Sequence, residues 1–449
     1  MPVLRLGSVI RGTAGNARGR IASPAGCHRL RRRLLSNVAA VLESRAILEI
    51  SGGDAKALLQ GLMTNDVTRL DEGNGGGLPC ISAAFLNPKG RVLGDALVTR
   101  SPRHEAKNKP GYLLDCPVAV AEGLKAHLKL YKLRSKVKIK DATAGYEVLV
   151  SGVHDPWQGS TRSGGEGDPS PPQVAPAAGL SDVDARSSAR FLDPRCAALG
   201  VRLIRPKGEA GPDGGAGWPN GDAVVSEERY HALRMINGVG EGSELLDSIP
   251  LESNLDLLGS ISFTKGCYVG QELTARTQFK GFVRKRVLPV IFPTEGDGGS
   301  TSPVENASNP AVAGDADQGQ GLMPASWASG AGRPEPGSRI VDQAAGDGKL
   351  GTLVAISPEY NVGLALLRLG KVMSPASGSR TTLDNDAADD DTVPPPDSEA
   401  AGGKTIPAVD CRIARAEGSD QGGEARQCLP LVPPWWPVDL DPATGKVPA

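Results

Sequence analysis

A single cysteine stands among glycines and polar residues in the segment Lys265–Glu272, which carries the clearest chemical signal in the sequence. The three residues 261–263 alternate like a strand, and the residues that follow the segment have a helical composition, so Cys267 is predicted to lie on a strand-to-helix turn. Gly270 is predicted to cap the helix. A helix N-terminus and the nearby Lys265 both favour thiolate over thiol. A thiolate here can ligate a metal or attack an electrophile.

Two other roles for Cys267 compete with this interpretation. Taken alone, an isolated cysteine is more often a small buried hydrophobic residue. A covalent nucleophile needs a base such as histidine, and none of the five histidines has motif spacing to Cys267. The seven cysteines include no pair with CxxC spacing, so the sequence encodes no complete cluster or zinc motif. A metal held by Cys267 therefore needs ligands from elsewhere.

The first 42 residues contain eight arginines and no acidic residue, and the first carboxylate belongs to Glu43. This composition is typical of a mitochondrial transit peptide, placed at residues 1–37, with a basic nucleic-acid-binding arm as the alternative. Without these eight positive charges the formal net charge changes from −1 to −9, and we identify no other basic patch. We expect a mitochondrial matrix protein without a nucleic-acid partner. The sequence has no run of about 18 apolar residues, so we predict no membrane span.

Glycine and proline concentrate in four segments, which are residues 156–190, 206–221, 294–347 and 374–405. These segments are predicted to be disordered insertions, because they hold too little apolar surface to offset the entropy of ordering. Helices and strands alternate up to about residue 280, and strands dominate after it. We therefore predict an α+β domain at 43–280, a small C-terminal β-barrel domain at 281–437 and a tail at 438–449.

The elements that must position the cysteine segment follow from the spacing of apolar residues. Strands are predicted at 46–50, 91–99, 111–115, 136–140, 146–150, 284–292, 351–356 and 362–369. Helices are predicted after a Ser51 capping box, after Pro117, and from Ser226 to a stop at Gly238. The residues Asn87–Gly90 predict a turn between two strands.

Several segments together resemble a known family, chiefly Leu59–Val67, Leu86–Asp95, Lys265–Glu272 and Pro434–Pro437. The chain resembles the YgfZ-type proteins, which are relatives of the folate-binding aminomethyltransferase of glycine cleavage (the GcvT family). The resemblance implies an aminomethyltransferase-like ring of three subdomains around a folate-sized cavity. It also implies a function, because the mitochondrial members of this family are iron–sulfur cluster assembly factors.

The resemblance points to a set of site residues as well. Cys267 is predicted to be the catalytic or metal-ligating residue, and the predicted cofactor-binding residues are Asn65, Asp66, Arg91, Asp95, Lys265 and Gln271. Arg91 and Asp95 lie on one face of a predicted strand, where they form an ion pair or contact a ligand. Lys265 would offset the negative charge of a cluster, and Gln271 or Glu272 would orient the turn through hydrogen bonds.

Two departures from the aminomethyltransferase pattern argue against aminomethyl transfer. That enzyme has an acidic pair where this sequence has Gly94 and Asp95, and a pterin-binding glutamate where this sequence has Ile236. Isoleucine cannot accept the hydrogen bonds that a carboxylate accepts. A tetrahydrofolate-dependent one-carbon transferase, with tetrahydrofolate as its cofactor, is therefore the second prediction.

The first prediction is a mitochondrial factor that matures [4Fe–4S] proteins of the aconitase and radical-SAM types. An iron–sulfur cluster needs about four ligands. Cys267 would supply one thiolate, and an A-type iron–sulfur carrier protein, the partner implied by the resemblance, would supply the others. A [2Fe–2S] or [4Fe–4S] cluster would be held transiently between the two chains. The protein would be a monomer alone and a heterodimer with its carrier.

Overall fold

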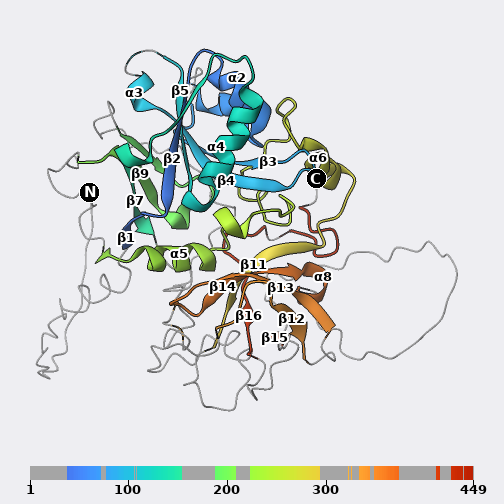
Figure 1. The fold of residues 1–449 in the computed structure, drawn as a ribbon. Helices are drawn as coiled ribbons and strands as arrows, with labels where there is room; N and C mark the ends of the chain where they lie inside the picture. The colour runs from blue at the N-terminus through green and yellow to red at the C-terminus, as the bar shows by residue number, and fades with distance from the viewer. Residues whose placement is uncertain are drawn as a thin grey trace, which may run out of the picture. The chain divides into compact units, whose positions relative to one another are not determined.

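The computed structural model describes residues 38–71, 77–105, 107, 109–153, 188–208, 223–293, 322, 325, 333–343, 348–373, 411–414, 426–437 and 439–447. All of them belong to one compact unit of the chain, Asn37–Ala449. The predicted transit segment and most of the predicted insertions lie outside the described residues. Three sheets with helices packed between and upon them give the α+β fold that the sequence predicts (Figure 1).

The sheet that supports the candidate site has five antiparallel strands in the order β3-β4-β5-β2-β6. They are β2 (Arg45–Ser51), β3 (Ile81–Leu86), β4 (Val92–Arg100), β5 (Gly111–Pro117) and β6 (Lys138–Asp141). Two helices, α2 (Ala55–Leu62) and α4 (Val118–Lys132), bury most of their leucines in one core with this sheet. Leu59, Leu124 and Leu128 are fully buried, as their helical spacing predicts.

The start of α2 differs from its prediction. Ser51 is the last residue of β2, and the helix begins only at Ala55. The Asp54 side chain makes no capping hydrogen bond with the helix. Instead, its Oδ2 accepts a hydrogen bond of 2.7 Å from the backbone N–H of Lys136. The predicted capping box is wrong because a distant segment of the chain occupies the carboxylate that would have completed it.

A second sheet has the strand order β10-β1-β7-β9-β8. Its strands are β1 (Val38–Val41), β7 (Tyr146–Val153), β8 (Ala189–Leu192), β9 (Val201–Pro206) and β10 (Ala223–Val224). Helix α5 (Glu227–Ile236) begins as predicted, with the Ser226 hydroxyl accepting a hydrogen bond from the N–H of Arg229. Its buried Tyr230, Leu233 and Ile236 form one core with this sheet and with the third sheet (Figure 1).

The third sheet is antiparallel, with the order β15-β12-β13-β14-β11-β16. Its strands are β11 (Lys285–Ile291), β12 (Arg339–Asp342), β13 (Gly348–Ile356), β14 (Val362–Arg368), β15 (Cys411–Ile413) and β16 (Leu429–Pro430). The sheet almost closes on itself, because the residues just before β16 pair with β15. There the N–H of Cys428 donates to the carbonyl of Cys411 at 2.9 Å. The predicted barrel-like C-terminal β domain is confirmed.

Two C-terminal parts of the structure depart from the composition-based boundaries. β12 lies inside residues 294–347, where an insertion is predicted, and its Ile340 is fully buried. Residues 439–447, predicted as a tail, pack on the domain: Leu440 is fully buried, and the carbonyl of Gly445 accepts hydrogen bonds from Arg286. A few apolar residues suffice for these contacts, and composition averaged over a long window does not reveal them.

Short helical segments complete the fold. They are α3 (Pro102–Glu105), α8 (Leu369–Val372) and the 3₁₀ helices η1 (Val67–Leu70), η2 (Thr143–Gly145), η3 (Ala197–Leu199) and η4 (Gly242–Glu244). Helix α6 (Gln271–Phe279) follows the cysteine segment, and Gly270 is its N-cap, as predicted.

Two glycines bring the β3–β4 turn against the start of α6 (Figure 1). Gly270 has a φ of 80°, and Gly90 in the turn has a φ of 78°. A Cβ on Gly270 would lie 2.4 Å from the carbonyl oxygen of Asn87, and a Cβ on Gly90 would lie 2.6 Å from the Cβ of Leu273. The turn and the helix can approach this closely because neither glycine carries a side chain.

Replacing Gly270 with alanine is therefore expected to destabilise the protein by about 2 kcal/mol or more, because the positive φ and the backbone clash both oppose a Cβ. Gly266→Ala is the matched control in the same segment, since nothing lies within 4 Å of its added Cβ. This control should change the free energy of unfolding by less than about 0.5 kcal/mol. Urea unfolding of both variants tests the contact, and equal stabilities would contradict it.

Candidate functional site

Cys267 lies in an exposed loop directly before α6. The residues 261–263, predicted as a strand, form none, so the cysteine follows an irregular segment rather than a strand. Among the cysteines that the structure describes, Cys267 is the one that is exposed. Burial raises the pKa of the Cys116 thiol to about 12 and that of Cys196 to about 11. Of the described thiols, Cys267 is thus the one that a metal or a partner can reach, and the buried-hydrophobe alternative is wrong.

The side chain of Lys265 is engaged by backbone carbonyl groups of another segment. Its Nζ donates hydrogen bonds to the carbonyl oxygens of Gln60 and Met63, both at 2.7 Å, and of Asn65 at 2.9 Å. These three acceptors match the three donors of an ammonium group. Burial lowers the pKa of Lys265 to about 8, with Asp66 opposing the shift. In this structure Lys265 anchors the cysteine loop to the end of α2.

Further hydrogen bonds fasten the loop to the last turn of α2 and to the segment that follows the helix. The N–H of Val269 donates to the carbonyl of Gly61, and the N–H of Ser262 donates to the carbonyl of Thr64, both at 3.0 Å. The Thr64 hydroxyl returns a hydrogen bond of 2.7 Å to the carbonyl of Ser260. The cysteine loop is therefore held along most of its length, although Cys267 itself is open to solvent.

Asn65 and Asp66, two predicted cofactor-binding residues, belong to this framework. The buried Asn65 amide donates to the carbonyls of Ser82 at 2.7 Å and Gly259 at 2.9 Å. The Asp66 carboxylate is the N-cap of η1 and accepts hydrogen bonds from the N–H and the hydroxyl of Thr68. Asn65 thus holds the residues just before the cysteine loop, whereas Asp66 bonds within its own segment, to Thr68 and Gln60.

Gln271 behaves as the sequence predicts. Its Oε1 accepts a hydrogen bond of 3.0 Å from the backbone N–H of Tyr268, the residue after the cysteine. Because Gln271 is the first residue of α6, this bond orients the turn between Cys267 and the helix. The Tyr268 ring in turn lies 5.0 Å from the Nζ of Lys265.

The structure separates Arg91 and Asp95, which are predicted to lie side by side. A guanidinium nitrogen of Arg91 donates to the carbonyl of Asp247 at 3.2 Å. Asp95 is only 6% exposed, and its Oδ1 accepts a hydrogen bond of 2.8 Å from the N–H of Gly242. The predicted pair is absent from the ion pairs of the described residues, because each side chain has its own partner near η4.

Asp95 instead belongs to a buried cluster of charges that the sequence analysis missed. The cluster combines four arginines with five carboxylates and consists of Arg45, Arg195, Arg202, Arg234, Asp95, Asp115, Asp193, Glu241 and Glu244. Arg202, from β9, contacts Asp115, from β5, at 2.8 Å, and so joins the first two sheets. Charged residues inside an apolar strand such as Val201–Pro206 are the signal that could have revealed it.

The protonation of this cluster follows from its charges. Burial opposes ionisation of Glu241, yet the guanidinium groups of Arg195, Arg45 and Arg234 hold its pKa well below the ordinary value. Burial and the neighbouring Glu241 raise the pKa of Asp95. The cluster thus sets five carboxylates against four guanidinium groups, and the ion pairs among them compensate most of its charge.

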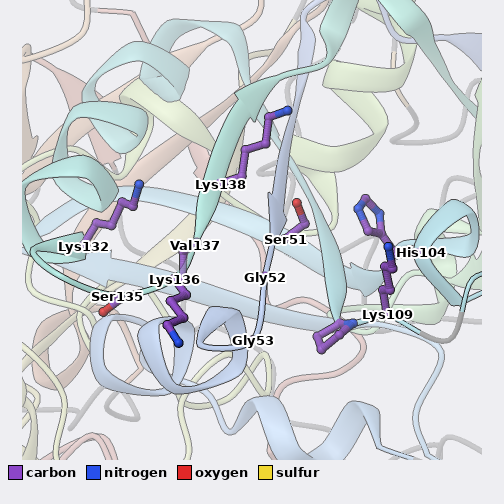
Figure 2. A pocket seen from close by; sticks show the side chains of 11 residues that line it. Ser51, Gly52, Gly53, His104, Lys109, Lys132, Ser135, Lys136, Val137 and Lys138 are labelled. Carbon is purple, nitrogen blue, oxygen red and sulfur yellow. The ribbon is translucent and has the colours of Figure 1, made fainter.

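Four lysines gather around one cavity, although the sequence predicts no basic patch after the first 42 residues. A cavity of about 550 Å³ between the end of β2 and the end of α4 is lined by Lys109, Lys132, Lys136, Lys138 and His104, among others. Within the described residues, none of these four lysines is paired with a carboxylate. Their side chains point in different directions around the cavity (Figure 2). Lys138 also begins the edge strand β6, where charge discourages pairing with another strand.

Neither a ready metal site nor a membrane helix emerges from the part of the chain that the structure describes. No group of three or more His, Cys, Asp or Glu side chains there is arranged to hold a metal ion. No described helix is long and apolar enough to cross a membrane.

Comparison with known proteins decides the family. No protein-family model matches the chain. The mitochondrial iron–sulfur cluster assembly factor IBA57 homolog of Mycosarcoma maydis is 32% identical over 402 residues, which cover 88% of this chain and 84% of that protein. The chain belongs to the IBA57 family of mitochondrial iron–sulfur cluster assembly factors. The human IBA57 protein is 36% identical over 265 residues, which cover 57% of this chain and 67% of the human one.

A solved structure extends this result to the fold. Aminomethyltransferase T of the glycine cleavage system from Bartonella henselae matches with a TM-score of 0.50 and 11% sequence identity, over 91% of this chain and 89% of that one. The fold is therefore aminomethyltransferase-like, as predicted. The predicted family and its mitochondrial assembly function are confirmed by the IBA57 relatives.

The Lys265 contact gives a stability prediction for this IBA57-family chain. Lys265→Met should lower the free energy of unfolding by about 1–3 kcal/mol, because it leaves three carbonyl oxygens without their donor. Hydrogen exchange at Val269 should also become faster, since the loop loses its anchor. Lys280→Met, at an exposed lysine, is the control and should change neither quantity. An unchanged Val269 exchange rate in Lys265→Met would show that the loop does not depend on the ammonium.

The buried charge cluster gives a pH prediction. The pKa values of Glu241 and Asp193 are lowered from their ordinary values of 4.5 and 3.8, so on unfolding both carboxylates take up protons in acid. Their stabilisation is present above about pH 4.5 and is lost as pH falls toward the folded-state values, while Asp95, with its raised pKa, opposes this trend. Urea unfolding between pH 7 and pH 3.5 should show the loss, and Asp193→Asn should reduce its slope. A stability that does not change across this range would contradict the assignment.

Proposed function

We propose that this chain matures [4Fe–4S] proteins in the mitochondrial matrix by sharing a transient iron–sulfur cluster with an A-type carrier protein. Cys267 would lose its proton and supply one thiolate, and the carrier would supply the remaining ligands. The observation that carries this proposal is the combination of an exposed Cys267 with a loop that is fastened along most of its length. A ligand held in place before the cluster arrives has less conformational entropy to lose on binding.

The relatives support the general role. Proteins named as mitochondrial iron–sulfur cluster assembly factors are 32% and 36% identical to this chain. The choice of an A-type carrier, the heterodimer and the [4Fe–4S] clients are the finer parts of the proposal. The ligand count calls for a second protein, because one thiolate meets only about a quarter of the requirement of a cluster. The class of carrier and the [4Fe–4S] clients are what the family resemblance implies.

The test mixes the full chain with an A-type carrier that holds a [2Fe–2S] cluster. Wild type should form a heterodimer with new thiolate-to-iron charge-transfer bands, and Cys267→Ser should lose these bands and fail to restore aconitase activity in cells that lack the protein. Cys196→Ser, at a half-buried cysteine, is the control and should behave as wild type. If Cys267→Ser keeps both the bands and the aconitase activity, the shared-ligand proposal is wrong.

A tetrahydrofolate-dependent one-carbon transferase is the second candidate, because the fold is that of an aminomethyltransferase. The position of Asp95 weighs against it. This carboxylate is buried, receives a hydrogen bond from Gly242 and lies in the charge cluster, whereas a transfer reaction needs an acid that meets its substrate. Turnover of tetrahydrofolate with an amine donor, abolished in Asp95→Asn while the fold is retained, would favour this second function. Tetrahydrofolate binding without turnover would leave it as a ligand of the assembly factor.

A further inference from the structure

Two phenylalanines stand out on the surface at the end of α6. Phe279, the last residue of the helix, is 69% exposed, and Phe282 is 58% exposed. The chain contains only six phenylalanines. Isolated exposed apolar residues are common, but these two large aromatic side chains lie only three residues apart in the chain, and aromatic residues are enriched where proteins bind one another. We refer to Phe279 and Phe282 together as the aromatic patch.

This patch is joined to the cysteine loop. The ring of Phe263, four residues before Cys267, lies 6.1 Å from the ring of Phe279 in an edge-to-face arrangement. Phe263 itself packs on a buried cluster that includes Leu86 and Val92, so the pair is anchored to the β3–β4 hairpin. The aromatic patch and the exposed thiol are therefore parts of one continuous segment on one support.

The segment that carries the patch is also fixed at its far end. The N–H of Val283 donates to the carbonyl of Thr444 at 2.8 Å, and the Nζ of Lys446 donates to the carbonyl of Gln278 at 2.6 Å. Val283, the residue after Phe282, is buried, and Gly445 of this terminal turn lies against it. The exposed rings thus extend from a backbone that is held on both sides, which keeps the entropy cost of binding low.

The charges around the patch indicate what it binds. Arg276, Lys280 and Arg284 are all exposed. None of them forms an ion pair with a carboxylate among the described residues, and Arg284 lies 5.9 Å from the ring of Phe282. Unpaired cations around an apolar centre suit a partner with an acidic rim and an apolar centre. A thiolate-ligated cluster adds negative charge to the protein that carries it.

We propose that Phe279, Phe282 and the flanking cations form the docking surface for the acidic face of the cluster-carrying partner. This inference rests on the proposed function, because it places the carrier on the same segment that presents Cys267. The docking surface would bring the carrier to the thiol before any iron–thiolate bond forms. Affinity would then come mainly from the aromatic pair, and the rate and salt dependence of association from the cations.

The experiment measures the affinity of the full chain for a cluster-free A-type carrier by titration calorimetry. The Phe279→Ser/Phe282→Ser double variant should weaken Kd at least tenfold, and Lys280→Glu/Arg284→Glu should weaken it mainly at low salt. Leu130→Ser/Leu133→Ser is the matched control, because it removes two exposed apolar residues, one in the last turn of α4 and one just after the helix, and should change Kd less than twofold. Circular dichroism and thermal unfolding check that each variant keeps the fold.

The outcomes separate this inference from the proposed function. Cys267→Ser should bind the cluster-free carrier like wild type and lose only the charge-transfer bands. If the phenylalanine variant binds the carrier normally while Cys267→Ser loses the bands, the docking surface is wrong and the shared ligand stands. If docking depends on the phenylalanines but Cys267→Ser keeps the bands, the shared ligand is wrong and the docking surface stands. Wild type that does not bind the carrier, or that uses the patch only to form a homodimer, overturns the inference.

Discussion

The ammonium group of Lys265 is the interaction on which the geometry around Cys267 depends. The last carbonyl groups of a helix have no partners within the helix, and Lys265 supplies donors to Gln60, to Met63 just beyond the end of α2, and to Asn65. One side chain thereby joins two segments about 200 residues apart. The ammonium group of Lys265 is used for this task, and Cys267, two residues later, is exposed in the same loop.

The glycine contact between the β3–β4 turn and α6 completes the support. Gly90 and Gly270 let two backbones approach more closely than any side chain would permit. Three sequence segments that look like independent motifs therefore meet at one place: the end of α2, the β3–β4 turn and the cysteine loop. Most of their polar residues serve to hold the loop, whereas Cys267 is exposed to solvent.

Local patterns in the sequence were enough for much of the fold, because they depend on residues close together in the chain. The Ser226 cap, the Gly270 cap and the apolar face of α4 were all predicted from spacing alone, and the structure confirms them.

Predictions failed where a distant residue decides the outcome. The Asp54 carboxylate accepts a hydrogen bond from the N–H of Lys136 instead of capping its helix. Arg91 donates to the carbonyl of Asp247, and Asp95 accepts from the N–H of Gly242, so the two side chains bind different partners. The sequence did not predict the buried charge cluster for the same reason, since its members include residues of the first two sheets and of α5. Removing such charges from water is costly, so a cluster of this kind is better explained as specifying how the sheets fit together than as a source of net stability.

The short turn near the end of the chain has a consequence for how the protein can be altered. Lys446 binds the carbonyl of Gln278, a residue 168 positions earlier, and Gly445 lies against Val283 where no side chain would fit. The orientation of Phe282 thus depends on residues that a sequence-based domain boundary would discard as a tail. Shortening this turn, or fusing a bulky tag to it, would disturb the surface beside Cys267 without changing any residue of that surface.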